Sequence, residues 1–420
     1  METSPSRRWI AFLLFAFLAG ATLRNAWLSD MEYKYDEKWM FDAARNGDVP
    51  DPWPWVGMRS GAGVANPGMS IWVFAAPARL LHLQDPVALA RVVTIAATLA
   101  IGLFMLLAAR RVPSPQREPW LWASALLAVN PGAVILQRKI WAQSVLPLLS
   151  VGALYGWWNR RTRWGAFLWG ALGACLGQIH MSGLFYAAGI FLWTALFDRK
   201  PDADGKRIRW GSWALGSALT GWPLLLWASE VFTPGRESAV FRPLEILEAR
   251  FYAHWGIEIS GLHAQFSLGR FSFRYWLTHP FVAGHPTYLI GVALVATVAL
   301  AVAALAVGLW SWWKDRASWR RRLTSRTSSA LAQNGALLAF GGLISISGLR
   351  IYPHYLLVAL PLVFLWLARS ALCSPRFGRF ILVGLFAGYT ALSAGFLTFV
   401  HTNAGASDGD YGVSYSHQGH

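Results

Sequence analysis

Charged side chains are scarce in this 420-residue chain, which rules out many classes of protein. Only 14% of the residues are charged, whereas 55% are hydrophobic, and the mean hydropathy is +0.37. Soluble globular domains carry about 25% charged residues, so the composition excludes an ordinary soluble domain. Several apolar stretches approach or exceed the roughly 20 residues that a helix needs to cross a bilayer. The sequence therefore predicts an all-α polytopic membrane protein.

Cysteine is almost absent, with only Cys175 and Cys373. The first falls within an apolar stretch and the second lies in a basic segment, so we do not expect them to meet. This excludes a disulfide framework and a cysteine-based metal cluster. The histidines between residues 254 and 285 also lack the close spacing of zinc ligands, so no metal site is expected from the sequence.

Apolar stretches predict about eleven transmembrane helices. They cover residues 9–28, 87–109, 119–137, 142–158, 164–179, 181–197, 210–228, 286–313, 329–348, 355–370 and 380–400. An odd number of crossings places the two termini on opposite sides of the membrane. Residues 1–400 are thus expected to form a single transmembrane domain. The tail at 401–420 is polar enough to be disordered unless its tyrosines find a surface.

Acidic residues are few as well, with 21 of them against 37 lysines and arginines and a formal net charge of +16. If the N-terminus is cytoplasmic, the cytoplasmic segments hold 22 of the basic residues and six of the acids. The whole net charge then lies on that side, as the positive-inside rule describes. The basic runs are therefore topology signals and contacts with membrane lipids, which argues against nucleic acid as a partner.

Two adjacent carboxylates, Asp36 and Glu37, follow the first apolar stretch within an outer loop at 29–86. Asp36 precedes a short helical pattern and has two interpretations. It is either the N-cap that accepts backbone N–H groups or a general base at the membrane surface. Glu37 is expected to support Asp36 or to form a surface salt bridge with Lys34 or Lys38.

Other outer segments are large or polar enough to contribute to a site. Residues 229–285 are rich in Arg, Glu, His and aromatic side chains, and the tail at 401–420 is rich in Gly, Ser, Asp and Tyr. In the first loop, an amphipathic stretch at 69–83, broken by Pro77, predicts a short helix that lies in the membrane interface. We expect 229–285 and the tail to determine acceptor choice or to bind a protein partner.

The order of these motifs resembles the GT-C superfamily of glycosyltransferases that use polyprenyl-phosphate sugars. Asp36-Glu37-Lys38-Trp39 follows the first span, Asn130-Pro131 precedes an outer turn with Gln137-Arg138-Lys139, and Arg350-Ile351-Tyr352-Pro353-His354-Tyr355-Leu356-Leu357 stands near the C-terminus. The branch it resembles most contains the protein O-mannosyltransferases, the lipid A aminoarabinose transferase and the lipopolysaccharide-core transferases. The resemblance covers roughly residues 9–200 and 345–370.

This resemblance implies an inverting transfer of a sugar from a polyprenyl-phosphate donor to the hydroxyl of a lipid, glycan or protein acceptor. It implies Asp36 as the catalytic base, with Glu37 in support. A leaving phosphate must be met by positive charge. The candidates are Arg138, Lys139 and Arg350, whose alternative role is contact with lipid headgroups.

Ring side chains are candidates for contact with the substrate, namely His180, Tyr352, His354 and Trp39. For each of them the alternative is an ordinary residue of the membrane interface, where tryptophan in particular acts as an anchor. The resemblance requires no cofactor and leaves a role for a divalent cation, Mg²⁺ or Mn²⁺, undecided.

Two other classes of membrane protein compete with this interpretation. A transporter shows paired broken helices or inverted repeats, with polar groups at mid-membrane, and the sequence shows neither. A non-catalytic assembly subunit that docks through its outer loops and tail stays open as the alternative. The favoured prediction is an enzyme of a bacterial inner (plasma) membrane, with a cytoplasmic N-terminus and a periplasmic or extracellular active face and C-terminus.

Overall fold

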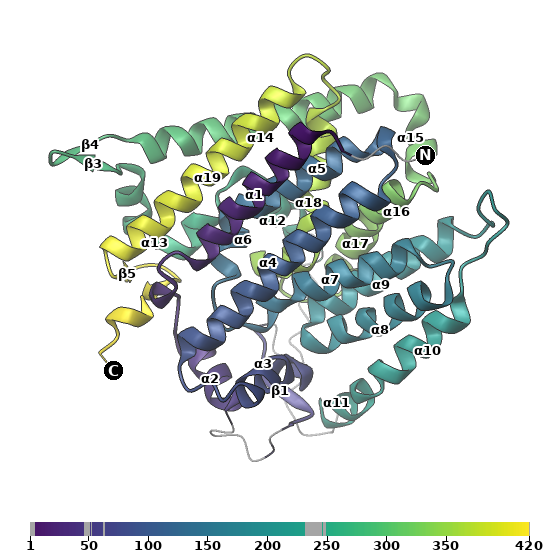
Figure 1. The fold of residues 1–420 in the computed structure, drawn as a ribbon, viewed down its shortest axis with the longest axis horizontal. Helices are drawn as coiled ribbons and strands as arrows, with labels where there is room; N and C mark the ends of the chain where they lie inside the picture. The colour runs from purple at the N-terminus through teal and green to yellow at the C-terminus, as the bar shows by residue number, and fades with distance from the viewer. Residues whose placement is uncertain are drawn as a thin grey trace.

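The computed structural model describes residues 5–45, 51, 53–61, 64–231, 246 and 249–419. Long helices make up most of it (Figure 1). One layer packs around α5 (Ser114–Val129), which contacts α1 (Arg7–Asn25), α4 (Pro86–Arg111), α18 (Leu360–Ala371) and α19 (Gly378–Thr402). The 26-residue helix α14 (Leu289–Lys314) packs on α18 and α19.

A second group of helices packs beside the first through α4 and α7 (Ala142–Trp158). Helix α8 (Arg163–Ile179) lies between α7 and α10 (Trp210–Gly221), and it also contacts α9 (Met181–Phe197). One more apolar helical segment packs against α9. It consists of α16 (Ser328–Asn334), a π-helical turn at Gly335–Ala339 and α17 (Phe340–Ile346).

Each apolar stretch expected from the sequence forms helix, but four of them are divided, one of which is the stretch at 329–348 that becomes α16, the π-helical turn and α17. The stretch at 119–137 becomes α5 and α6 (Pro131–Leu136), and the stretch at 210–228 becomes α10 and α11 (Pro223–Val231). A proline begins the second helix in both cases, because proline lacks the N–H that would continue the first. The stretch at 355–370 begins as a 3₁₀ segment at Pro353–Ala359, which leads into α18.

Five helices of the described chain are long and apolar enough to cross a membrane. They are Pro86–Arg111, Leu289–Lys314, Ser328–Ile346, Pro353–Ala371 and Gly378–Thr402. Length and composition are the criteria for these five, and the expected total of about eleven crossings stays a prediction. The protein is thus an all-α integral membrane protein.

Short elements gather at the end of the molecule opposite the N-terminus, around α2 (Tyr35–Ala44) and α3 (Met69–Leu80) (Figure 1). They include a 3₁₀ turn at Leu28–Asp30, the hairpin of β1 (Val56–Arg59) and β2 (Ala65–Pro67), and the hairpin of β5 (Gly405–Ala406) and β6 (Gly412–Val413). Residues 229–285 include α12 (Arg250–Ser260), α13 (His263–Leu277) and the strand β3 (Phe281–Val282), which pairs with β4 (His285–Pro286). The rest of that region, at 232–245 and 247–248, lies outside the described residues.

The C-terminal tail is ordered through contacts with the first outer loop of the same chain. Tyr411 is buried, and its hydroxyl donates to the carbonyl of Asp30 at 2.5 Å. The ring of Tyr415 lies edge-on to Tyr33, with 4.9 Å between the ring centroids. These two tyrosines are the residues expected to need a surface, and the first loop provides it, because buried aromatic rings offset the entropy of ordering a polar segment.

Two buried arginines tie helix ends together beneath this region. The Arg24 guanidinium donates to carbonyls near the C-terminus of α5, at Leu127 and Ala128. The Arg138 guanidinium does the same at the end of α1, where its four acceptors are the carbonyls of Leu23, Arg24, Ala26 and Trp27. The last carbonyls of a helix lack partners within it, so a cation is well suited to this position.

Candidate active site

A cavity of about 570 Å³ lies among the short elements at this end. Its walls come from α2 and the residues before it, the β1–β2 hairpin, the turn between α6 and α7, the segment around Tyr352, the start of α13, and the tail at Asp410. Segments that are far apart in sequence therefore form one site, and both the second outer region and the tail contribute to it.

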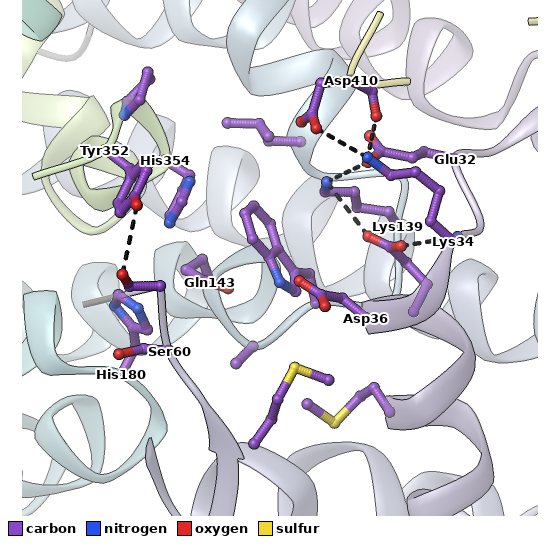
Figure 2. A pocket seen from close by; sticks show the side chains of 18 of the residues that line it. Glu32, Lys34, Asp36, Ser60, Lys139, Gln143, His180, Tyr352, His354 and Asp410 are labelled. Carbon is purple, nitrogen blue, oxygen red and sulfur yellow. Dashed lines mark hydrogen bonds and ion pairs between the residues drawn. The ribbon is translucent and has the colours of Figure 1, made fainter. Parts of the chain in front are cut away.

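The two adjacent carboxylates have different roles in this wall. Helix α2 begins at Tyr35, and Glu37 at its third position accepts a hydrogen bond from the N–H of Lys34 at 3.0 Å. Glu37 is thus the capping carboxylate, and the interpretation of Asp36 as the N-cap is wrong because the helix starts two residues earlier than that interpretation required, with Lys34 at the N-cap position. Figure 2 shows Asp36 between Lys139 on one side and His354 on the other.

Asp36 differs from the other carboxylates of this wall in having no bonded partner among the described residues. Among the described residues, its side chain forms no hydrogen bond and no ion pair. Burial raises its pKa above that of an ordinary aspartate, and the negative charge of Glu37 raises it further. A half-buried carboxylate with a raised pKa is a stronger base than one in water, which suits it to accept a proton.

The other charges beside Asp36 form a compact charged cluster of Glu32, Lys34, Glu37, Lys139 and Asp410. The Lys139 ammonium lies 3.0 Å from a carboxylate oxygen of Glu32 and 3.4 Å from one of Glu37. The Lys34 ammonium lies 2.9 Å from the same Glu32 oxygen and 3.0 Å from a carboxylate oxygen of Asp410. Buried charges are stable only when paired, and this cluster pairs them.

Electrostatics keeps both lysines of the charged cluster protonated. Burial by itself would lower the pKa of Lys139, but Glu32 and Glu37 outweigh it and raise the pKa. Burial would likewise lower the pKa of Lys34, whereas Glu32 and Asp410 raise it. Burial has the opposite effect on Glu32, whose pKa it raises despite the nearby lysines.

Rings form the opposite wall of the cavity (Figure 2). His354 stacks on Tyr352, with 5.5 Å between centroids and 8° between planes, and lies 4.3 Å from the ring of Trp141. His180 caps α9, since its Nδ1 accepts from the N–H of Ser182 at 3.2 Å. Burial lowers the pKa of His180 to about 3, so its ring stays neutral. Stacked rings and a neutral imidazole suit a sugar.

Three of the residues expected in the site do not line the cavity. All of the hydrogen bonds that the described part of the chain shows for Arg138 go to the end of α1, and Arg138 does not line the cavity, so its assignment to the donor phosphate stays a prediction that this geometry does not favour. Arg350 is exposed at the rim, 5.3 Å from the ring centroid of Tyr352. Trp39 packs against the hydrophobic core and is absent from the cavity lining.

Several lining residues were not found from the sequence. The ring centroid of Trp141 lies 4.0 Å from the Lys139 ammonium, which makes the two a cation–π pair. Trp141 is only two residues from Lys139 in the sequence, and this closeness could have identified it. Gln143 is buried with its Oε1 lacking a partner among the described residues. Nothing in the sequence indicated that Glu32 and Asp410 belong to the site. Only the tertiary fold buries Glu32, and only the fold brings Asp410 to Lys34.

A divalent cation does not fit the charged cluster. The Lys139 ammonium already lies between Glu32 and Glu37, so a cation there would have to displace a buried, protonated lysine. Across the described parts of the chain, no group of three His, Cys, Asp or Glu side chains is placed to hold a metal ion.

Solved structures with a similar arrangement of helices come from an archaeon. The oligosaccharyltransferase of Archaeoglobus fulgidus in its apo form matches with a TM-score of 0.51 and 15% identity, over 95% of this chain and 56% of that chain. The same protein tethered to an acceptor peptide matches with a TM-score of 0.50 and 16% identity, over 93% of this chain and 55% of that one. This chain has the GT-C fold.

At such identities the likeness of this chain to its neighbours is one of fold, and it spans just over half of their length. A third structure is that of ArnT from Cupriavidus metallidurans bound to undecaprenyl phosphate. It has a TM-score of 0.48 and 12% identity, over 94% of this chain and 76% of that chain, and adds nothing to the fold assignment. No protein-family model and no curated protein matches the sequence.

Proposed function

We propose that this GT-C chain is an inverting glycosyltransferase that moves a sugar from a polyprenyl-phosphate donor to an acceptor hydroxyl. The reaction takes place at the outer face of a bacterial inner membrane, where the lipid of the donor stays in the bilayer and its phosphate reaches the cavity. The acceptor is a lipid, a glycan or a protein. The GT-C fold, shared with an oligosaccharyltransferase, supports transfer of a glycosyl group.

The observation that carries the proposal is the position of Asp36. Asp36 lines a cavity of about 570 Å³ and has a raised pKa. The adjacent Glu37 carboxylate caps helix α2, whereas the Asp36 carboxylate does not. An acceptor hydroxyl needs such a base because its proton must leave as the new bond forms.

The chemistry follows from this arrangement in one displacement. The acceptor oxygen forms a bond to the anomeric carbon while the bond from that carbon to the phosphate oxygen breaks. The phosphate leaves with the electron pair, and the acceptor proton goes to a carboxylate oxygen of Asp36. Tyr352 and His354 present stacked rings on which the sugar can be oriented, and orientation lowers the barrier to the displacement. No step requires a metal ion.

The decisive experiment replaces Asp36 by asparagine. We expect Asp36→Asn to lower kcat by about 10²- to 10⁴-fold, because the amide cannot accept the proton. Donor binding and the melting temperature should stay at wild-type values. The measurement is transfer from a panel of undecaprenyl-phosphate sugars by the purified protein.

Asp42→Asn is the matched control, since Asp42 lies on the same helix α2 and does not line the cavity. It should retain wild-type turnover. An Asp36→Asn protein with wild-type turnover would rule out the base. A wild-type protein that transfers no sugar from any donor of the panel would instead favour the alternative, a non-catalytic assembly subunit.

A further inference from the structure

Three buried polar atoms that line the cavity have no hydrogen-bond partner among the described residues. They are Nε2 of His180, the hydroxyl oxygen of Tyr355 and Oε1 of Gln143. These residues are 0%, 1% and 4% exposed, respectively. A buried polar atom without a partner destabilises the fold, whereas a ligand in the cavity can supply the missing bond. The three residues, which we call the neutral subsite, therefore form a place for a polar ligand.

The contacts of His180 decide which of its ring nitrogens carries the proton. Its Nδ1 accepts a hydrogen bond from the N–H of Ser182 at 3.2 Å, so Nδ1 is unprotonated. Burial lowers the pKa of His180 to about 3, which leaves a neutral ring with a single proton. That proton is on Nε2, because a neutral imidazole is protonated at one nitrogen or the other. His180 thus offers a hydrogen-bond donor to the cavity.

The neutral subsite adjoins the stacked rings of the cavity and lies away from the charged cluster. The ring centroids of His180 and Tyr355 are 4.8 Å apart, and His354 is 4.8 Å from Tyr355 and 6.2 Å from His180. Figure 2 shows His180 on the side of the cavity away from Lys34, with Asp36 between them. A ligand at the neutral subsite therefore meets ring faces and dipoles rather than full charges.

The chemistry of the three unpartnered groups matches sugar hydroxyls. Each hydroxyl both donates and accepts, so it can accept from His180, donate to Gln143, and do either with Tyr355. The ammonium of an amino sugar has no lone pair and would meet the N–H of His180. The carboxylate of a uronic acid would be buried without a cation beside it, which is costly.

We propose that the neutral subsite binds the hydroxyls of the donor sugar and selects an uncharged hexose over an amino sugar or a uronic acid. The inference rests on the proposed function and names the sugar class of its donor. The hexose lies with its hydroxyls at His180, Tyr355 and Gln143 and with its anomeric carbon toward Asp36. A site built to bond hydroxyls discriminates well, because a poorly matched sugar leaves its buried groups unpaired.

The first test compares matched donors on the purified full chain in detergent. The probes are undecaprenyl phosphates that carry glucose, glucosamine with its free amine, or glucuronate, and the same three sugars in the galacto and manno configurations. Undecaprenyl phosphate without a sugar is the reference. We expect the wild type to bind the uncharged hexose of one configuration about tenfold or more tightly than its amino and uronic counterparts. Equal or tighter binding of a charged counterpart would overturn the inference.

The second test removes single groups of the neutral subsite. Tyr355→Phe deletes only a hydroxyl that lacks a partner, so its melting temperature should not fall. His180→Asn keeps an oxygen that can cap α9 and loses the Nε2–H. We expect each variant to bind the hexose donor about three- to tenfold more weakly and to bind undecaprenyl phosphate as the wild type does.

Tyr389→Phe is the matched control. The hydroxyl of Tyr389 is also buried, but it donates to the carbonyl of Ile259 and does not line the cavity. This variant should melt at a lower temperature and bind the hexose donor normally.

The outcomes separate this inference from the proposed function. If Tyr355→Phe and His180→Asn bind the hexose donor as tightly as the wild type, water alone fills the neutral subsite, and the inference is wrong while Asp36-dependent transfer stands. An equal loss of affinity for undecaprenyl phosphate would also overturn it. If the wild type transfers none of the sugars and binds none of these donors better than undecaprenyl phosphate, the proposed function fails as well.

Discussion

At the scale of single residues, the site depends on two carboxylates that are adjacent in sequence and differ in environment. Successive positions of a helix point about 100° apart, so one side chain can cap the helix while its neighbour faces the cavity. Glu37 is bonded to Lys34 and lies near Lys139. Asp36 keeps its oxygens for a reactant, and its pKa is raised first by burial and then by the neighbouring Glu37.

This coupling predicts a shift in the pH dependence of transfer. As the pH falls through the raised pKa of Asp36, the carboxylate takes up a proton and can no longer accept one, so the rate falls. Glu37→Gln removes the negative neighbour that raises this pKa. The acidic limb of the kcat/KM profile should therefore move to lower pH.

The glutamine keeps an oxygen that can cap α2, so the helix should remain intact, which circular dichroism can confirm. Asp42→Asn is expected to leave the limb where it is. An unchanged limb in Glu37→Gln would show that a group other than Asp36 controls the rate in acid.

At the scale of elements, the helix ends at the base of the cavity are held by buried arginines. Arg138 donates to four carbonyls at the end of α1, and Arg24 donates to carbonyls near the end of α5. Lys139 follows Arg138 directly, so the capping of α1 also places the ammonium that pairs with Glu32. Arg138 thus caps the end of α1, and by doing so it also positions Lys139 for its contacts in the charged cluster.

Arg138→Gln should act on stability rather than on donor recognition. The glutamine cannot reach four carbonyls, and unpaired buried acceptors cost about 1–3 kcal/mol in the free energy of unfolding. We expect a clearly lower melting temperature in detergent. Arg350→Gln, at the exposed rim, should melt like the wild type. A variant of Arg138 that melts normally but shows a raised donor KM would restore Arg138 as a phosphate ligand.

At the scale of the whole molecule, the C-terminal tail packs against the first loop at the end of the molecule that holds the cavity. The tail bonds the first loop through Tyr411, and Asp410 joins the charged cluster. Figure 1 places the C-terminus near this end and the N-terminus away from it. The tail is therefore part of the site wall.

Cysteine labelling tests this topology directly. In a chain whose Cys175 and Cys373 are replaced by serine, Ser407→Cys in the tail should react with a membrane-impermeant maleimide added from outside. Asp204→Cys, in the exposed loop between α9 and α10, should react only after the membrane is opened. Labelling of Ser407→Cys from the cytoplasmic side alone would overturn the orientation and, with it, the placement of the cavity at the outer face.

The sequence by itself determined the helical architecture and the position of Asp36. Long apolar runs need no tertiary information to become helices, because lipid leaves the backbone no other way to satisfy its hydrogen bonds. The start of α7 at 142 and the bounds of α9 at 181–197 agree with the expected stretches. Lys139, His180, Tyr352 and His354 were predicted as site residues, and all four line the cavity.

Only the tertiary structure decided which polar groups are engaged. Arg138 and Lys139 are neighbours with the same charge, yet one reaches the end of α1 and the other the cavity, since where a side chain finds its acceptors depends on distant segments. Glu258 and His263 come together with α6 only through packing of residues more than 120 positions apart. Composition and spacing record the residue types, whereas burial and pairing, which determine charge and reactivity, arise when the chain is folded.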